Sequence, residues 1–269
     1  MITIKSPREV AIMTEAGRIL AETLAVVRSN AEPDVSTGEL DRIAEEFIRS
    51  HPGAVPSFKG LYDFPKTLCT SLNEEIVHGI PSELRVLNEG DILSVDCGVC
   101  LEGLHADSAT TIPIGEVDAE TKRLLQVTQD ALAAGIAEAT VGNYTGDIGF
   151  AIQAVAEAAG YSVVRELVGH GIGTNFHEEP QVPNFGKPKR GRKLVQGMTI
   201  AIEPMVNLGG AAIRTLDDRW TVVTADGSRS AHFEHTVLIH PSGPRLLTDH
   251  VTTIEPATSG PKSTVSTSG

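Results

Sequence analysis

The spacing of apolar positions predicts two helices at the start of the chain. Apolar residues recur three or four positions apart at Ile12, Ala16, Ile19, Leu20 and Leu24, as on one face of an amphipathic helix. Ser6-Pro7-Arg8-Glu9 combines a capping box with a proline at the first helical position, so this helix is predicted from there to about Arg28. Ser36 and Glu39 give a second capping signal, which predicts a helix ending near Ser50.

Short apolar runs of strand length follow, and the whole plan then occurs a second time. Strands are predicted over 67–73, 91–99 and 104–114. The second half predicts helices over 119–140 and from 145 to Gly160, a C-cap residue, and then strands near 161–167, 198–204, 220–224 and 232–239. This order predicts an α+β domain with pseudo-two-fold symmetry and helices packed on a sheet. We expect one domain over 1–251, with halves of about 1–117 and 118–251.

The candidate chemistry is duplicated in the same way. Gly90 is followed six residues later by Asp96, and Gly197 is followed six residues later by Glu203, with an apolar run in each interval. Two further pairs echo each other in the same order: Val77-His78-Gly79-Ile80 with Gly169-His170-Gly171-Ile172, and His105-Ala106-Asp107 with His232-Phe233-Glu234. Two half-sites that face each other would therefore bring several carboxylates and imidazoles together.

So many acidic groups in one interior position indicate metal binding, because like charges at close range resist ionising together. The candidate ligands are Asp96, Asp107, His170, Glu203 and Glu234. Carboxylates with an imidazole suit ions such as Mn²⁺, Fe²⁺, Co²⁺ or Zn²⁺, and bridging carboxylates can hold two ions. From the pattern alone His105 and His232 compete with His170 as ligands, since they share a strand face with Asp107 and Glu234.

Composition and charge narrow the class of protein. The 269 residues carry a formal net charge of −13, which argues against general nucleic-acid binding. The exception is Lys187–Lys193, with five basic residues in seven; it is either a solvated loop or a contact for RNA or another acidic surface.

The N-terminus lacks a signal-peptide pattern, and no apolar run approaches the roughly 20 residues that span a membrane. We expect a cytoplasmic protein. The tail over 252–269, rich in Ser, Thr, Pro and Gly, is predicted to be disordered.

Several long motifs closely resemble those of the methionine aminopeptidases. They are Asn73-Glu-Glu-Ile-Val-His78-Gly-Ile-Pro81, Asp91-Ile-Leu-Ser-Val-Asp96, His105-Ala-Asp107, Gly169-His170-Gly-Ile-Gly173, Phe176-His177-Glu-Glu-Pro180, Thr199-Ile-Ala-Ile-Glu203-Pro204-Met205 and Glu234-His235-Thr236. The resemblance covers about residues 3–250 and implies the pita-bread fold, with helices on a curved antiparallel sheet. His177 and Glu203 are 26 positions apart, which leaves no room for the helical insertion of the type II enzymes. The chain resembles a short bacterial type I enzyme.

The resemblance implies a dinuclear site and its chemistry. Asp96 and Asp107 would hold one divalent ion, His170 and Glu203 the other, and Asp107 and Glu234 would bridge them; the sequence does not choose among Co, Mn, Fe, Zn and Ni. A hydroxide between the ions would attack the peptide bond. Glu203 would also move a proton to the leaving amine.

The same resemblance assigns residues that contact substrate. His177 would donate to the carbonyl oxygen as it becomes an oxyanion, and His78 would contact the scissile amide nitrogen. By position match, the methionine pocket would be lined by Phe58, Leu61, Phe64, Cys69, Phe176 and Trp220. Phe58 and Leu61 depart from the better-known members, where a cysteine and a tyrosine are expected.

The implied activity is removal of the initiator methionine from nascent proteins whose second residue is small, by a monomeric enzyme. Two alternatives stay open from the sequence. One is a related pita-bread peptidase acting on Xaa-Pro bonds. The other is a non-catalytic pita-bread binding protein that uses the Lys187–Lys193 loop as its contact surface. In the enzyme, the same loop would dock weakly on the ribosome.

Overall fold

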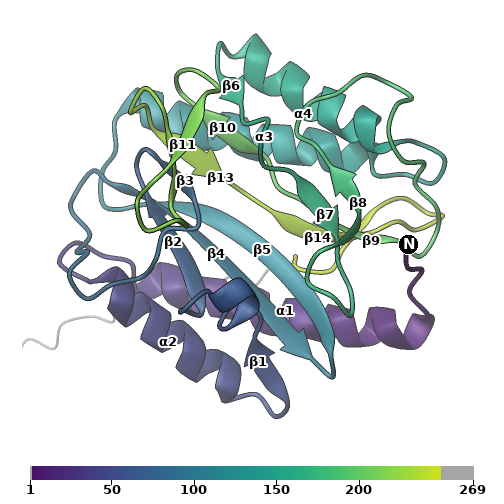
Figure 1. Ribbon diagram of the computed structural model, residues 1–269, viewed down its shortest axis with the longest axis horizontal. Coiled ribbons are helices and arrows are strands. Elements are labelled where there is room, and N and C mark those ends of the chain that lie inside the picture. The colour runs from purple at the N-terminus through teal and green to yellow at the C-terminus, as the bar shows by residue number, and fades with distance from the viewer. Residues whose placement is uncertain (1, 250–269) are drawn as a thin grey trace, which may run out of the picture.

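The computed structural model describes residues 2–249, and Figure 1 shows its arrangement. The helices are α1 (Pro7–Asn30), α2 (Thr37–Arg49), the short 3-10 helix η1 (Leu61–Asp63), α3 (Ala119–Glu138) and α4 (Thr145–Ala158). The strands of the first half are β1 (Ala54–Pro56), β2 (Leu68–Leu72), β3 (Glu75–Val77), β4 (Ile92–Leu101) and β5 (Leu104–Pro113). Those of the second half are β6 (Ser162–Val163), β7 (Gly169–Gly171), β8 (Glu178–Val182), β9 (Thr199–Ile202), β10 (Met205–Asn207), β11 (Ile213–Thr215), β12 (Val222–Thr224), β13 (Ser230–His232), β14 (His235–Leu238) and β15 (Arg245–Leu246). The predicted tail over 252–269 lies outside the described residues.

The first two helices begin where the capping signals place them. The Glu9 amide donates to the Ser6 hydroxyl at 3.3 Å, and the Ser6 amide donates to the Glu9 carboxylate at 2.7 Å, which completes the capping box. The Glu39 amide donates to the Ser36 hydroxyl at 3.1 Å. Both helices end within two residues of the predicted positions, so local hydrogen bonding sets these boundaries.

The duplicated glycines perform the same task in each half. Gly90 and Gly197 adopt left-handed backbone, with φ of 88° and 85°, which glycine reaches without steric cost. Each then donates its amide at 2.9 Å to a carbonyl just after the partner strand, Ile114 for Gly90 and Ile239 for Gly197. Each glycine therefore starts the strand that leads to a carboxylate, and the sequence repeat is also a structural one.

Two helix pairs cover the strands. In Figure 1, α1 lies against β4 and β5, α2 packs against α1 and the nearby β1 and β2, and α3 and α4 lie beside the strands of the second half. Leu20 and Leu40 pack with Val95 of β4 in one apolar cluster, and Leu124 of α3 packs with Ile200 of β9 in another. The paired strands are antiparallel. In the described part of the chain, no helix is long and apolar enough to cross a membrane.

The predicted strand over 232–239 is wrong as a single element. β13 ends at His232 and β14 begins at His235. Between them the Glu234 amide donates to the Ala109 carbonyl of β5 at 3.0 Å, so the chain leaves one ladder to bond with the other half of the molecule. The predicted strand over 161–167 likewise shortens to the two residues of β6. The length of a strand depends on which other strands lie beside it to form hydrogen bonds, and the local sequence pattern carries no information about those neighbours.

The two halves are joined beside the candidate ligands. The Asp107 amide donates to the Thr236 hydroxyl at 2.9 Å, and that hydroxyl donates to the Asp107 carbonyl at 2.8 Å. The Ser108 hydroxyl donates to the Glu234 carbonyl at 2.7 Å. These buried hydrogen bonds hold the backbone of β5 against the second half of the chain, at the point where β5 supplies Asp107 and the second half supplies Glu234.

Candidate metal centre and substrate cavity

The five predicted ligands come from separate elements and meet in one cavity of about 280 Å³. Asp96 lies on β4 and Asp107 on β5, diagonally across the hairpin, since Asp96 pairs with Ala109 and Asp107 with Gly98. His170 is the central residue of β7, Glu203 follows β9, and Glu234 occupies the break between β13 and β14. All five side chains line the same space.

The imidazole of His170 is oriented as a metal ligand would be. Its Nδ1 lies 2.9 Å from the Gly171 carbonyl oxygen, which can only accept, so Nδ1 carries the proton. Nε2 then presents a lone pair and lies 3.7 Å from both Asp107 Oδ2 and Glu203 Oε1. Ligand atoms of Asp107, His170 and Glu234 all lie within 4.8 Å of one another.

Three of the carboxylates each have one buried oxygen without a hydrogen-bond donor. Asp96 Oδ1, Asp107 Oδ1 and Glu234 Oε1 have no hydrogen-bond partner among the described residues, and unpaired buried charge is strongly unfavourable. Burial raises the pKa of Asp107 to about 7. Burial, and then the neighbouring carboxylates, raise the pKa of Asp96, Glu203 and Glu234 well above the usual range. Divalent cations would neutralise this acidic cluster and supply the missing partners, so the donor set fits metal ions.

The structure places the three alternative histidine ligands, His105, His170 and His232, in different surroundings. His105 does not line the cavity; its Nδ1 lies 2.9 Å from the Ser57 hydroxyl. His232 lies beside the cluster, with Nε2 3.9 Å from Glu203 Oε2, and is 1% exposed. Burial lowers the pKa of His232 to about 3. Of these three histidines, His170 is the one that lines the cavity.

The six predicted methionine-pocket residues all line the cavity that contains the acidic cluster. The rings of Phe58 and Phe176 meet edge to face with centroids 5.2 Å apart, and those of Phe64 and Trp220 do so at 5.0 Å. Cys69 is buried, and burial raises the pKa of its thiol, so it acts as an apolar wall. An apolar, aromatic wall suits a flexible thioether side chain.

His78 and His177 also line this cavity. Burial lowers the pKa of each to about 4, so both imidazoles are neutral at pH 7. His78 lies at φ 61° with its ring edge-on to Trp220, the centroids 6.4 Å apart. Tyr62 lines the cavity too, and sequence reasoning missed it. The sequence signal that could have identified Tyr62 was its position between two predicted pocket residues, Leu61 and Phe64.

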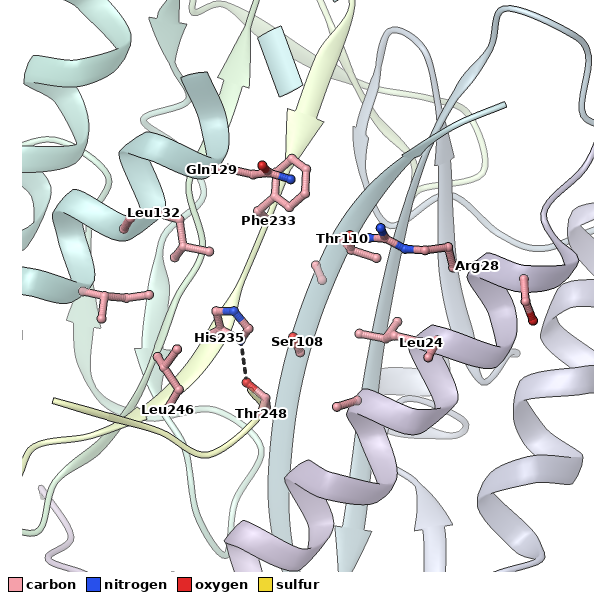
Figure 2. A pocket seen from close by; sticks show the side chains of 16 residues that line it. Leu24, Arg28, Ser108, Thr110, Gln129, Leu132, Phe233, His235, Leu246 and Thr248 are labelled. Carbon is pink, nitrogen blue, oxygen red and sulfur yellow. Dashed lines mark hydrogen bonds between the residues drawn. The ribbon is translucent and has the colours of Figure 1, made fainter. Parts of the chain in front are cut away.

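A larger groove of about 850 Å³ lies on the other side of β5 (Figure 2). It runs between α1 and α3 and is lined mostly by apolar side chains, with Phe233 and Leu24 across from each other. Ser108 and Thr110 of β5 face this groove, whereas Asp107 faces the acidic cavity, as strand alternation requires. None of its lining residues is a carboxylate, so the smaller cavity is the candidate active site.

Comparisons with known proteins agree with this geometry. Residues 11–241 match the model of metallopeptidase family M24. The methionine aminopeptidase of Clostridium perfringens is 53% identical over 248 residues, which cover 92% of this chain and 99% of that protein. The crystal structure of a methionine aminopeptidase from Thermotoga maritima superposes with a TM-score of 0.91 at 42% identity, covering 93% of this chain and 100% of that one.

A prolidase from Pyrococcus horikoshii gives a TM-score of 0.75 at 20% identity, covering 91% of this chain and 63% of that one. That likeness shows the fold alone. The predicted α+β pita-bread fold is confirmed by these structural neighbours. The metallopeptidase match and the buried Asp–His–Glu cluster also confirm use of divalent metal. The chain belongs to metallopeptidase family M24, among its type I bacterial methionine aminopeptidases.

Proposed function

We propose that this chain removes the N-terminal methionine from polypeptides whose second residue is small. The observation that carries the proposal is one cavity in which a cluster of four carboxylates and His170 adjoins a pocket lined by aromatic and apolar side chains. The first part suits metal-assisted hydrolysis and the second suits a methionine side chain. The high identity to methionine aminopeptidases over nearly the whole chain supports it.

We infer that the cluster holds two divalent ions. Asp96 and Asp107 would bind one, His170 and Glu203 the other, and Asp107 and Glu234 would bridge. When bound, such ions lower the pKa of water so that hydroxide is available near neutral pH. Co, Mn, Fe, Zn and Ni all remain candidates, since oxygen ligands with one imidazole accept each of them.

The protein's own side chains would position the substrate and move its protons. The methionine side chain would enter between Phe58, Phe176 and Trp220. His177 would donate to the carbonyl oxygen of the scissile bond, where negative charge develops, and His78 would contact the scissile nitrogen. Glu203, which lines the same cavity, would carry a proton to the leaving amine.

The test is methionine release by the purified full-length chain with Mn²⁺ or Co²⁺. Peptides that begin Met-Gly or Met-Ala should be cleaved, and Xaa-Pro peptides should not. Asp107→Ala should abolish both activity and metal binding, because it removes the bridging carboxylate; Asp130→Ala, on the exposed side of α3, is the matched control. Absence of methionine release with every one of the five candidate metals would refute the proposal. Preferential cleavage of Xaa-Pro bonds would favour the prolidase-like alternative.

We also propose that residues 1–251 work as a single catalytic domain, since both halves supply ligands. The enzyme would act as a cytoplasmic monomer on nascent chains, with the Lys187–Lys193 loop as a weak contact for the ribosome. The exposed side chains of Lys189, Arg190 and Arg192 support such a contact. Unchanged co-sedimentation with ribosomes after charge reversal at these three positions would count against it.

A further inference from the structure

Tyr62 lines the cavity and contacts His177. The two rings are nearly parallel, with an interplanar angle of 18° and centroids 5.7 Å apart. The tyrosine hydroxyl oxygen lies 3.3 Å from Nδ1 of His177. Tyr62 is nevertheless 66% exposed, although large aromatic residues are usually well buried. Its placement is therefore explained by the contact with His177 rather than by core packing.

The backbone around Tyr62 is held in an unfavourable conformation to make this contact. Tyr62 and Asp63 have φ of 50° and 68°, and Gly60, two residues before Tyr62, has φ of 91°. Left-handed backbone is uncommon for residues other than glycine, and it persists where surrounding bonds impose it. Here the Gly60 amide donates to the Phe64 carbonyl at 2.8 Å, and the Phe64 amide donates to the Leu61 carbonyl at 2.9 Å. This closed turn directs Tyr62 toward the cavity.

The hydroxyl contact bears on which nitrogen of His177 carries the proton. A neutral imidazole has one N–H and one acceptor nitrogen. A phenol hydroxyl donates more readily than it accepts, because its oxygen lone pair is delocalised into the ring. Donation from Tyr62 to Nδ1 therefore leaves the proton on Nε2. Among the residues that the structure describes, Nε2 of His177 has no hydrogen-bond partner, so its N–H is available to a ligand in the cavity.

We propose that Tyr62 is a positioning residue that fixes His177 as the Nε2–H tautomer and thereby prepares it to donate to the carbonyl oxygen of the scissile bond. The parallel ring contact restricts rotation of the imidazole, and the hydroxyl selects the tautomer. The assignment rests on the proposed function, since it supplies the donor that His177 needs there. In the other tautomer Nε2 would be an acceptor and would repel the same oxygen.

The first test needs no substrate. The full-length chain, labelled with ¹⁵N-histidine and loaded with Zn²⁺, is measured by long-range ¹H–¹⁵N correlation, which distinguishes protonated from unprotonated ring nitrogens. We expect the Nε2–H form of His177 in the wild type and a shift toward a mixture in Tyr62→Phe, which keeps the ring and removes the hydroxyl. Tyr144→Phe, outside the cavity, is the matched control and should change nothing. An Nδ1–H tautomer in the wild type would overturn the proposal.

The second test is kinetic. Because one neutral hydrogen bond is lost, Tyr62→Phe should lower kcat for a Met-Ala peptide by roughly 3- to 10-fold, with KM changed by less than about twofold. Tyr62→Leu, which also loses the parallel ring contact, should lower kcat further. An unaltered kcat in Tyr62→Phe would contradict the positioning role. If the wild type releases no methionine at all, the proposed function fails, whereas the tautomer of His177 still decides the role of Tyr62.

Discussion

Asp107 should make the metal-free protein less stable as the pH rises toward neutrality, because its carboxylate is buried beside other carboxylates. Asp107 is 3% exposed, and burial raises its pKa from 3.8 to about 7. At Asp107 the folded state therefore keeps a proton that the unfolded chain releases, so the contribution of this group to stability falls as the pH rises through this window. Each pH unit costs about 1.4 kcal/mol, so Asp107 alone removes on the order of 4 kcal/mol between pH 4 and pH 7.

The assay is urea unfolding of EDTA-treated protein between pH 4.5 and 7.5, compared with Asp107→Asn. The amide is nearly the same size as the carboxylic acid but does not ionise, so the variant should lose less stability over the window. It should become the more stable of the two at pH 7.5. Adding Mn²⁺ at about one hundred times its dissociation constant should stabilise the wild type by about 2.7 kcal/mol. Parallel pH profiles for the two metal-free proteins would refute the reasoning.

Three further outcomes are expected. Lys5→Met should lower the free energy of unfolding in urea by about 3 kcal/mol, because the Lys5–Glu178 pair at 2.7 Å has side chains only 4% exposed. The control Arg42→Met breaks exposed pairs and should lower it by under about 1 kcal/mol. Equal losses of stability in the two variants would contradict this view. Trp220→Ala should lower kcat/KM for Met-Ala peptides by roughly tenfold or more, because it removes a half-buried ring of the pocket wall that packs edge to face on Phe64, and aromatic contacts are worth about 0.5–1.5 kcal/mol beyond their buried area. Phe150→Ala, exposed on α4, is its control, and an equal effect there would exclude the pocket assignment. Chelation should abolish methionine release, and excess divalent metal should restore it; activity that survives exhaustive chelation would rule out the metal mechanism.

Features set by short-range interactions were predicted well. The capping box of Ser6 and Glu9 and the Ser36 cap place two helix starts correctly, because each involves residues three apart on one chain. The repeated glycines, Gly90 and Gly197, needed only the left-handed backbone that glycine adopts. The five candidate ligands were also identified in advance, from the repeat and from the family resemblance, and the structure brings all of them to one cavity.

The order of the elements, the main helix starts and the identity of the acidic residues could therefore be read from the sequence. The three-dimensional arrangement of the chain separates the three candidate histidines: His105 turns to Ser57, His232 lies beside Glu203 outside the cavity, and His170 lines it. It also broke the predicted strand at Glu234 and brought Tyr62 onto His177. The physical reason is that capping and glycine conformation are local, whereas ladder partners and the contacts of a side chain come from distant parts of the chain.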